Sequence, residues 1–304
     1  MKKQRLTALL SIGAAVSLML AGCSSGAPDA SDAGSSGDAE SKGTITLGFI
    51  PSWTDGLSTA YLLENQLTQL GYDVELKELT EAGVLYAGLS NGDIDVYPSA
   101  WPEVTHAEYM ETFGDDIESL SAYYDGASLT IAVPSYTDID SLDELAANAD
   151  LFGGEIIGIE PGAGLTGVTE NSMMPAYGLS DSFNLITSST ATMLTALGEA
   201  IDKNEDIVVT LWRPFWAYNA YDVKDLADPL GAMGESESLH FLGKRGFAEE
   251  FPEAAEYIAG IKLDDEAYGS LEGLVTSEPW EGDPAGAVAL WISENPGAFP
   301  TLIS

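Results

Sequence analysis

The chain of 304 residues has one cysteine and two histidines. A single cysteine, Cys23, excludes an internal disulfide and any metal site built from several cysteines. The histidines, His106 and His240, have no metal-binding spacing. No phosphate-binding loop ending in Lys-Ser or Lys-Thr occurs. The Gly-x-Ser-x-Gly pattern occurs at 22–26 and at 88–92, but at neither place does it join a predicted strand to a following helix, as a nucleophile elbow requires. We therefore expect no catalytic residues, no metal site and no cofactor.

Basic residues are also scarce, with 11 Lys and Arg against 49 Asp and Glu and a formal net charge of −38. Such a charge excludes nucleic acid as a partner and disfavours anionic ligands, whereas zwitterions are tolerated and cations are mildly attracted. The acidic residues are scattered over predicted helices and form no single cluster. We interpret them as a solvated surface suited to salty surroundings, where mobile ions screen their mutual repulsion.

Long apolar runs are absent after residue 23, and the one before it is short. Three basic residues precede an apolar stretch, residues 6–20, which is too short and too rich in Ala, Gly and Ser for a permanent membrane span. We interpret residues 1–22 as an export signal, so the mature protein would act outside the cytoplasm. Its removal would leave eight basic residues against the same 49 acidic ones.

The predicted signal ends in the residues LAGC at positions 20–23. This sequence resembles the bacterial lipobox, and the resemblance implies cleavage before Cys23 and lipidation of its thiol. Residues 23–43 are rich in Ser, Gly, Ala and Asp and have little to bury, so we expect a flexible tether. The chain would then be held at the outer face of the cell membrane by a lipid anchor.

From residue 44 onward, strand patterns alternate with helix patterns in two series. The first series has strands at 45–50, 72–79 and 94–97 and helices at 57–70 and 84–90. The second has strands at 128–134, 156–159, 183–186 and 207–211 and helices at 141–147, after 164 and at 190–201. This alternation is typical of parallel sheets flanked by helices. It predicts an α/β protein with two lobes.

The last part of the chain is predicted to return to the first lobe. It has a strand at 239–242 and helices at 252–261, 264–275 and 284–294. We therefore assign residues 44–133 and 239–304 to lobe 1 and residues 134–238 to lobe 2. The chain then crosses between the lobes twice, near 133–134 and near 234–239.

Three tryptophans each stand at the end of a predicted strand: Trp53, Trp101 and Trp212. Open α/β sheets bind small molecules at such strand ends. An indole face attracts a cation that has no N–H group to donate, because it offers negative charge density and no directed acceptor. The three residues predict an aromatic box, whereas Trp280 and Trp291 are expected to pack in the core.

A candidate anion site lies in the segment GIEPGAGLT, residues 158–166. A strand, a glycine-rich turn and a helix start follow one another there, and free backbone N–H groups at a helix start favour an anion. Such a turn also simply joins elements in many proteins. His106 follows Trp101 by five residues and is a candidate donor to a carboxylate, whereas His240 is interpreted as structural.

Five separate motifs make the chain similar to the glycine betaine substrate-binding proteins of ABC transporters. They are FIPSW at 49–53, GDIDV at 92–96, AWPEVTH at 100–106, GIEPGAG at 158–164 and LWRPFW at 211–216. The resemblance implies a two-lobed periplasmic-binding-protein fold of type II, also called a Venus flytrap. It also implies an aromatic box around a trimethylammonium group.

The resemblance assigns roles to individual residues. The box would be Trp53, Trp101 and Trp212. The ligand carboxylate would be bound by the backbone amides of Gly164 and Leu165 and by His106. Three more residues are possible contacts behind these: Ala163, Phe215 and Trp216. Phe215 departs from the family, since many members have histidine there.

The sequence thus predicts a monomeric, lipid-anchored receptor for glycine betaine or a close relative. It would present this zwitterionic quaternary ammonium compound to the permease subunits of an ABC importer, for osmoprotection. A choline or carnitine receptor on the same fold is the alternative. A lipoprotein enzyme or an adhesin built on this fold is a remote one.

Overall fold

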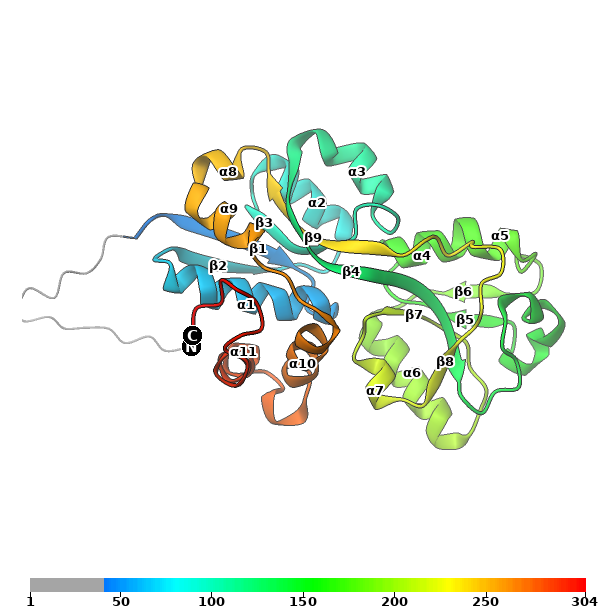
Figure 1. Ribbon diagram of the computed structural model, residues 1–304. Helices are drawn as coiled ribbons and strands as arrows, with labels where there is room; N and C mark the ends of the chain where they lie inside the picture. The colour runs from blue at the N-terminus through cyan, green and yellow to red at the C-terminus, as the bar shows by residue number, and fades with distance from the viewer. Residues whose placement is uncertain (1–40) are drawn as a thin grey trace, which may run out of the picture. The chain divides into compact units, whose positions relative to one another are not determined.

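A computed structural model describes residues 41–304 (Figure 1). The predicted export signal, Cys23 and nearly all of the predicted tether lie outside these residues. Within the described part, no helix combines the length and the apolar character that crossing a membrane requires.

One continuous series of strands organises the fold, in the order β2-β1-β3-β9-β4-β7-β5-β6, with β8 paired to β4. In the first lobe β1 is parallel to β2 and β3, and β9 is antiparallel to β3. The strands of this lobe are β1 (Thr44–Phe49), β2 (Asp73–Glu78), β3 (Val96–Ala100) and β9 (Glu237–Lys244). Its helices are α1 (Thr54–Gln69), α2 (Ala82–Asn91), α3 (Ala107–Phe113), α8 (Phe247–Glu250), α9 (Pro252–Ala259), α10 (Asp265–Val275) and α11 (Pro284–Glu294).

The second lobe has a smaller sheet in which β5 is parallel to β6 and β7, while β4 is antiparallel to β7 and β8. Its strands are β5 (Glu155–Ile157), β6 (Asn184–Ile186), β7 (Val209–Arg213) and β8 (Val223–Asp225). Its helices are α4 (Gly164–Val168), α5 (Met174–Ala176), α6 (Thr190–Lys203) and α7 (Ala217–Ala220).

Strand β4 (Ile117–Pro134) belongs to both sheets. It pairs with β9 from Ile117 to Ala127 and with β7 from Ser128 to Ala132. Figure 1 shows β4 and β9 running side by side from one lobe toward the other. Gly126, just before the change of partner, has a φ of 93°, a conformation that glycine adopts without steric cost.

The two-lobed α/β fold with two crossings is the one predicted from the sequence. The sequence did not predict the first half of β4, where polar and apolar residues mix. The change of partner at Ala127 and Ser128 also comes earlier than the expected boundary at 133–134. The residue ranges assigned to the lobes stay a prediction.

One predicted helix, residues 141–147, takes a different form. The structure has two short 3₁₀ segments there, Leu142–Glu144 and Ala146–Phe152. Asn148 lies inside the second with non-helical dihedrals, and its side-chain amide donates to the carbonyl of Glu144 at 2.8 Å. A local bond of this kind competes with regular helix hydrogen bonds.

Local signals fix several of the other helices. The side chains of Ser189, Asp264 and Asp283 accept from the backbone at the starts of α6, α10 and α11, which satisfies amides that have no partner within the helix. Helix α2 ends at Gly92 in the left-handed region.

Candidate functional site

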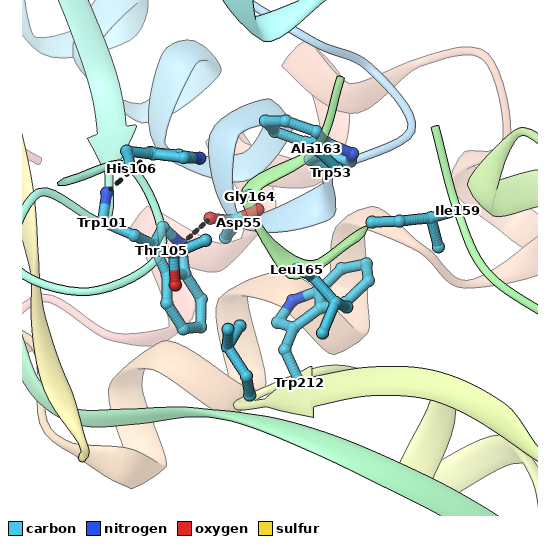
Figure 2. A pocket seen from close by; sticks show the side chains of 11 residues that line it. Trp53, Asp55, Trp101, Thr105, His106, Ile159, Ala163, Gly164, Leu165 and Trp212 are labelled. Carbon is cyan, nitrogen blue, oxygen red and sulfur yellow. Dashed lines mark hydrogen bonds between the residues drawn. The ribbon is translucent and has the colours of Figure 1, made fainter. Parts of the chain in front are cut away.

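The candidate site is a cavity of about 350 Å³, counting the part that is open to solvent. Eleven side chains are drawn around it in Figure 2. All six residues predicted to bind the ligand line it, together with Ala163. The complete lining is Trp53, Asp55, Trp101, Thr105, His106, Leu129, Ile159, Ala163, Gly164, Leu165 and Trp212.

Both lobes contribute to this cavity. The first provides Trp53, just before α1, and the segment from Trp101 to His106 between β3 and α3. The second provides Trp212 on β7 and the short helix that begins at Gly164. The cavity therefore lies where the lobes meet, and its shape depends on their separation.

Trp53 is fixed at both its polar edge and its face. Its indole Nε1 donates to Oε2 of Glu160 at 3.2 Å, and its ring stacks on the imidazole of His106 with 6.0 Å between centroids. The side chain is 9% exposed. Because Glu160 belongs to the second lobe, this hydrogen bond joins an aromatic residue of one lobe to an acid of the other.

Trp101 is held by a buried carboxyl group. Its Nε1 donates to Oδ2 of Asp55 at 3.1 Å, and the hydroxyl of Ser99 donates to the same oxygen at 2.6 Å. Burial raises the pKa of Asp55, and the bonds from Ser99 and Trp101 oppose that shift. Asp55 also lines the cavity, so the site has an acidic group close to two of its indoles.

A second buried acid lies near the same helix start. Glu272 on α10 is 3% exposed, and Thr54 donates to its carboxyl at 2.5 Å. Burial, with a smaller contribution from the nearby Asp55, raises the pKa of Glu272 to about 8, although the bond from Thr54 opposes this shift. This carboxyl group is therefore mostly protonated at neutral pH.

Trp212 is backed by Phe215, whose ring stacks on it with 3.9 Å between centroids. Phe215 is buried and does not line the cavity. Trp216 lines a different hollow, which it shares with Trp280 and others. Of the three possible contacts named from the sequence, only Ala163 reaches the cavity.

His106 is almost wholly buried, and its surroundings define its proton position. Its Nδ1 accepts from the backbone N–H of Trp101 at 3.2 Å and lies 3.0 Å from the hydroxyl of Tyr86. Burial lowers the pKa of His106 to about 3. The ring is therefore neutral at physiological pH and carries its proton on Nε2, which has no acceptor among the described residues.

The segment that carries His106 is held in shape by Glu237 of β9. The carboxylate of Glu237 accepts from the backbone N–H groups of Glu103, Val104 and Thr105 at 2.9–3.1 Å. It also accepts from the Thr105 hydroxyl at 2.5 Å. This anchor fixes the turn between β3 and α3, and with it the imidazole.

The glycine-rich turn of the second lobe approaches this same segment closely. Ala163 precedes helix α4, so the amides of Gly164 and Leu165 are at the helix start and have no acceptor within it. A Cβ atom on Gly164 would lie 1.8 Å from the carbonyl oxygen of Thr105. Only glycine permits this contact between the lobes.

Sequence reasoning missed four residues of the lining: Asp55, Thr105, Leu129 and Ile159. Asp55 follows Trp53 by two residues at a helix start, which is also an ordinary place for an acid. Leu129 lies within an apolar strand and Ile159 follows one, so neither differs in pattern from a core residue. Thr105 and Ile159 lie inside the motifs at 100–106 and 158–164, where only the neighbouring residues were predicted to bind the ligand.

Two other polar residues have structural partners. The Nδ1 atom of His240 lies 2.9 Å from the hydroxyl of Ser119, and its Nε2 atom lies 2.8 Å from Oε1 of Glu103. His240 does not line the cavity. Arg213 pairs with Asp225 at 2.6 Å and covers the ring of Tyr218. Residues 41–304 contain no group of three or more His, Cys, Asp or Glu side chains that could hold a metal ion.

The architecture and the position of the cavity define the class of protein. Two α/β lobes joined by two crossings, with a cavity between them, form a type II periplasmic-binding-protein fold. The profile of the family described as the substrate binding domain of ABC-type glycine betaine transport systems matches residues 43–294. The chain belongs to this family.

Individual relatives agree with the family. The chain is 34% identical, over 144 residues, to the glycine betaine/carnitine transport binding protein GbuC of Listeria monocytogenes serotype 1/2a (strain 10403S). That match covers 46% of this chain and 46% of the relative. The match thus spans about half the length of this relative and agrees with the family to which the chain belongs.

Solved structures match over more of the chain. The glycine betaine/L-proline-binding protein ProX of Borrelia burgdorferi superposes with a TM-score of 0.79 and 30% identity, over 86% of this chain and 97% of that one. Lactococcal OpuAC, in a closed form with glycine betaine, superposes with a TM-score of 0.75 and 29% identity, over 84% and 97%. A choline-binding protein with 23% identity and a TM-score of 0.74, over 83% of this chain and 89% of that one, shares the fold.

Proposed function

We propose that this protein captures glycine betaine, or a betaine of similar shape, outside the cell and delivers it to the permease of an ABC importer for osmoprotection. The observation that carries the proposal is the meeting of three indoles from both lobes in one cavity, beside a neutral histidine and two free amides. Each half of the ligand would have its own partners.

The quaternary ammonium group would be bound by Trp53, Trp101 and Trp212. A cation over an indole face gains about 0.5 kcal/mol when exposed and about 2 kcal/mol when desolvated. Three faces would then supply roughly 2 to 6 kcal/mol, whereas a micromolar affinity requires about 8 kcal/mol. The remainder has to come from the other end of the ligand.

The carboxylate would be bound by the amides of Gly164 and Leu165 and by Nε2 of His106. All three are donors, and none has an acceptor among the described residues. A hydrogen bond to a charged group contributes about 1.5 to 3 kcal/mol. Since His106 carries no charge at physiological pH, its role would be that of a directed donor and not of an ion-pair partner.

Choline or carnitine remains the alternative ligand, and one observation favours choline. Asp55 places a carboxyl group in the cavity wall, where it would attract a cation and oppose a second carboxylate. Choline has no carboxylate, and its hydroxyl group could donate to an acid. In that case the amides of Gly164 and Leu165 would not be engaged.

The cellular setting is part of the same proposal. An export signal at residues 1–22 and lipidation of Cys23 would hold the monomeric protein at the outer face of the membrane, next to its permease. Replacing Cys23 with serine should abolish the incorporation of labelled fatty acid into the protein. Labelling of the Cys23→Ser protein equal to that of the wild type would contradict lipidation at this residue.

Titration calorimetry with glycine betaine, proline betaine, carnitine and choline tests the proposed ligand. We expect both betaines to bind and choline to bind more weakly. Dimethylglycine is the matched control, because it keeps the carboxylate and replaces one N-methyl group by a proton. The absence of heat with every betaine would contradict the proposal, and a preference for choline would establish the alternative.

A further inference from the structure

Glu160 makes an unusual set of contacts behind the wall of the cavity. It stands between Ile159 and Pro161, after strand β5, and does not line the cavity itself. Its carboxylate accepts four hydrogen bonds. The donors are Ser52 Oγ at 3.1 Å, Trp53 Nε1 at 3.2 Å, Thr190 N at 3.0 Å and Thr190 Oγ1 at 2.9 Å.

These four donors divide equally between the lobes. Ser52 and Trp53 belong to the first lobe, whereas Thr190 begins helix α6 of the second. Each carboxylate oxygen accepts one bond from each side, since Oε1 bonds Ser52 and the Thr190 amide while Oε2 bonds Trp53 and the Thr190 hydroxyl. Thr190 thus orients Glu160 within its own lobe, and the oriented carboxylate bonds to the opposite lobe.

The same turn meets the first lobe at two further points. The hydroxyl of Tyr109 donates to the carbonyl of Gly162 at 2.7 Å, and Gly164 packs against the carbonyl of Thr105. The turn from Glu160 to Gly164 therefore carries the contacts between the lobes together with the amides assigned to the ligand. When the lobes close, this turn would come against the first lobe and complete the cavity at the same time.

We propose that Glu160 is an interlobe latch: a positioning residue that holds the lobes closed and sets the plane of the Trp53 indole against the ligand. The inference deepens the proposed function and rests on it. A carboxylate is suited to the position because it only accepts, and all four partners can donate. Its negative charge at the N–H edge of Trp53 also adds to the negative potential that the indole presents to a cation.

The latch forms only when the lobes are closed, so its loss should affect release more than capture. We expect Glu160→Gln to raise the dissociation rate of glycine betaine roughly tenfold, as for the loss of a bond to a charged group, and to leave the association rate nearly unchanged. Either orientation of the glutamine amide turns an N–H₂ group toward a fixed donor, which is the Thr190 amide or the Trp53 indole. Stopped-flow tryptophan fluorescence measures both rates.

Two further variants separate the latch from a general weakening of the second lobe. Ser52→Ala removes one donor in the first lobe without touching the box or Thr190, and we expect a smaller change in the same direction. Glu155→Gln removes the same charge from an exposed position on β5 and should release ligand as the wild type does. In the double variant of Ser52 and Glu160 the two effects should be less than additive, because both changes break one contact.

The outcomes distinguish this inference from the function on which it rests. A wild-type protein that does not bind glycine betaine contradicts the proposed function. Binding by the wild type, with wild-type release rates in both the Glu160 and Ser52 variants, overturns the latch alone. An equally faster release in Glu160→Gln and in Glu155→Gln would also overturn it, since the loss of a negative charge from the second lobe, and not the loss of a contact between the lobes, would then account for the effect.

Discussion

Replacing Gly164 with alanine should weaken ligand binding without weakening the fold. In the closed structure the new Cβ would lie 1.8 Å from the carbonyl oxygen of Thr105, and contacts of this kind below 3.0 Å essentially do not occur. The turn and the Thr105 segment must therefore separate by about 1.2 Å, the difference between these two distances. No flexible side chain can absorb this shift, because the obstructing atom belongs to the backbone.

The consequences of that shift can be estimated from the neighbouring contacts. The Tyr109 hydroxyl, 2.7 Å from the Gly162 carbonyl oxygen, would move beyond hydrogen-bonding distance. A ligand carboxylate held between the Gly164 amide and His106 would lose one of its partners, at a cost of about 1.5 to 3 kcal/mol. The dissociation constant for glycine betaine should then rise roughly 10-fold to 150-fold.

Gly167→Ala is the matched control for this experiment. It lies on the same helix, and a Cβ atom there would meet nothing within 4 Å. Alanine is favoured over glycine in helices by up to about 1 kcal/mol, so neither variant should lower the melting temperature of the free protein. Calorimetric affinities within about twofold of each other for wild type, Gly164→Ala and Gly167→Ala would refute the reasoning, because 0.4 kcal/mol or less would separate them.

Three further variants test other parts of the site. Trp212→Ala should weaken glycine betaine binding by roughly 1 to 3 kcal/mol, through loss of an indole face and of burial, and an unchanged calorimetric affinity would remove Trp212 from the box. His106→Ala should cost roughly 1 to 3 kcal/mol for glycine betaine and less for choline, so equal losses would show that the imidazole does not contact the carboxylate. The pKa of Glu272 is about 8 in the folded protein, above the ordinary 4.5. The protonated side chain therefore contributes fully to the free energy of unfolding below pH 4.5, and this contribution is lost as the pH rises toward 8. Relative to Glu272→Gln, chemical denaturation of the wild type should show an unfolding free energy that falls by up to about 1.4 kcal/mol per pH unit in this window, and parallel pH profiles would contradict the raised pKa.

The sequence predicted those site residues whose side-chain type and place at the end of a predicted strand or the start of a predicted helix both indicate a role. Trp53 and Trp101 each come shortly after an apolar strand, and Trp212 lies near the end of one. Because open α/β sheets bind small molecules at such strand ends, the pattern predicted that the three indoles would meet. The glycine-rich turn was recognisable for a similar reason, since Gly164 stands at a helix start. These features are local in the chain.

The partners that orient the indoles were not local. Trp53 bonds an acid 107 residues away, and Trp101 bonds one 46 residues away. Nothing in a single acidic chain distinguishes Glu160 or Asp55 from the other 47 acids. The first half of β4 was missed for a different reason, because a half-exposed strand with mixed polarity has no clear alternation.

The shared strand also constrains how the protein can open. Both crossings run through β4 and β9, which are hydrogen-bonded to each other from Ile117 to Ala127. The lobes are thus connected by a two-stranded ribbon and not by two independent loops, and such ribbons twist more readily than wide sheets do. Gly126 lies where the two strands of the ribbon separate. We therefore expect the lobes to open by a twist of this ribbon, which costs little elastic energy and closes again along the same path.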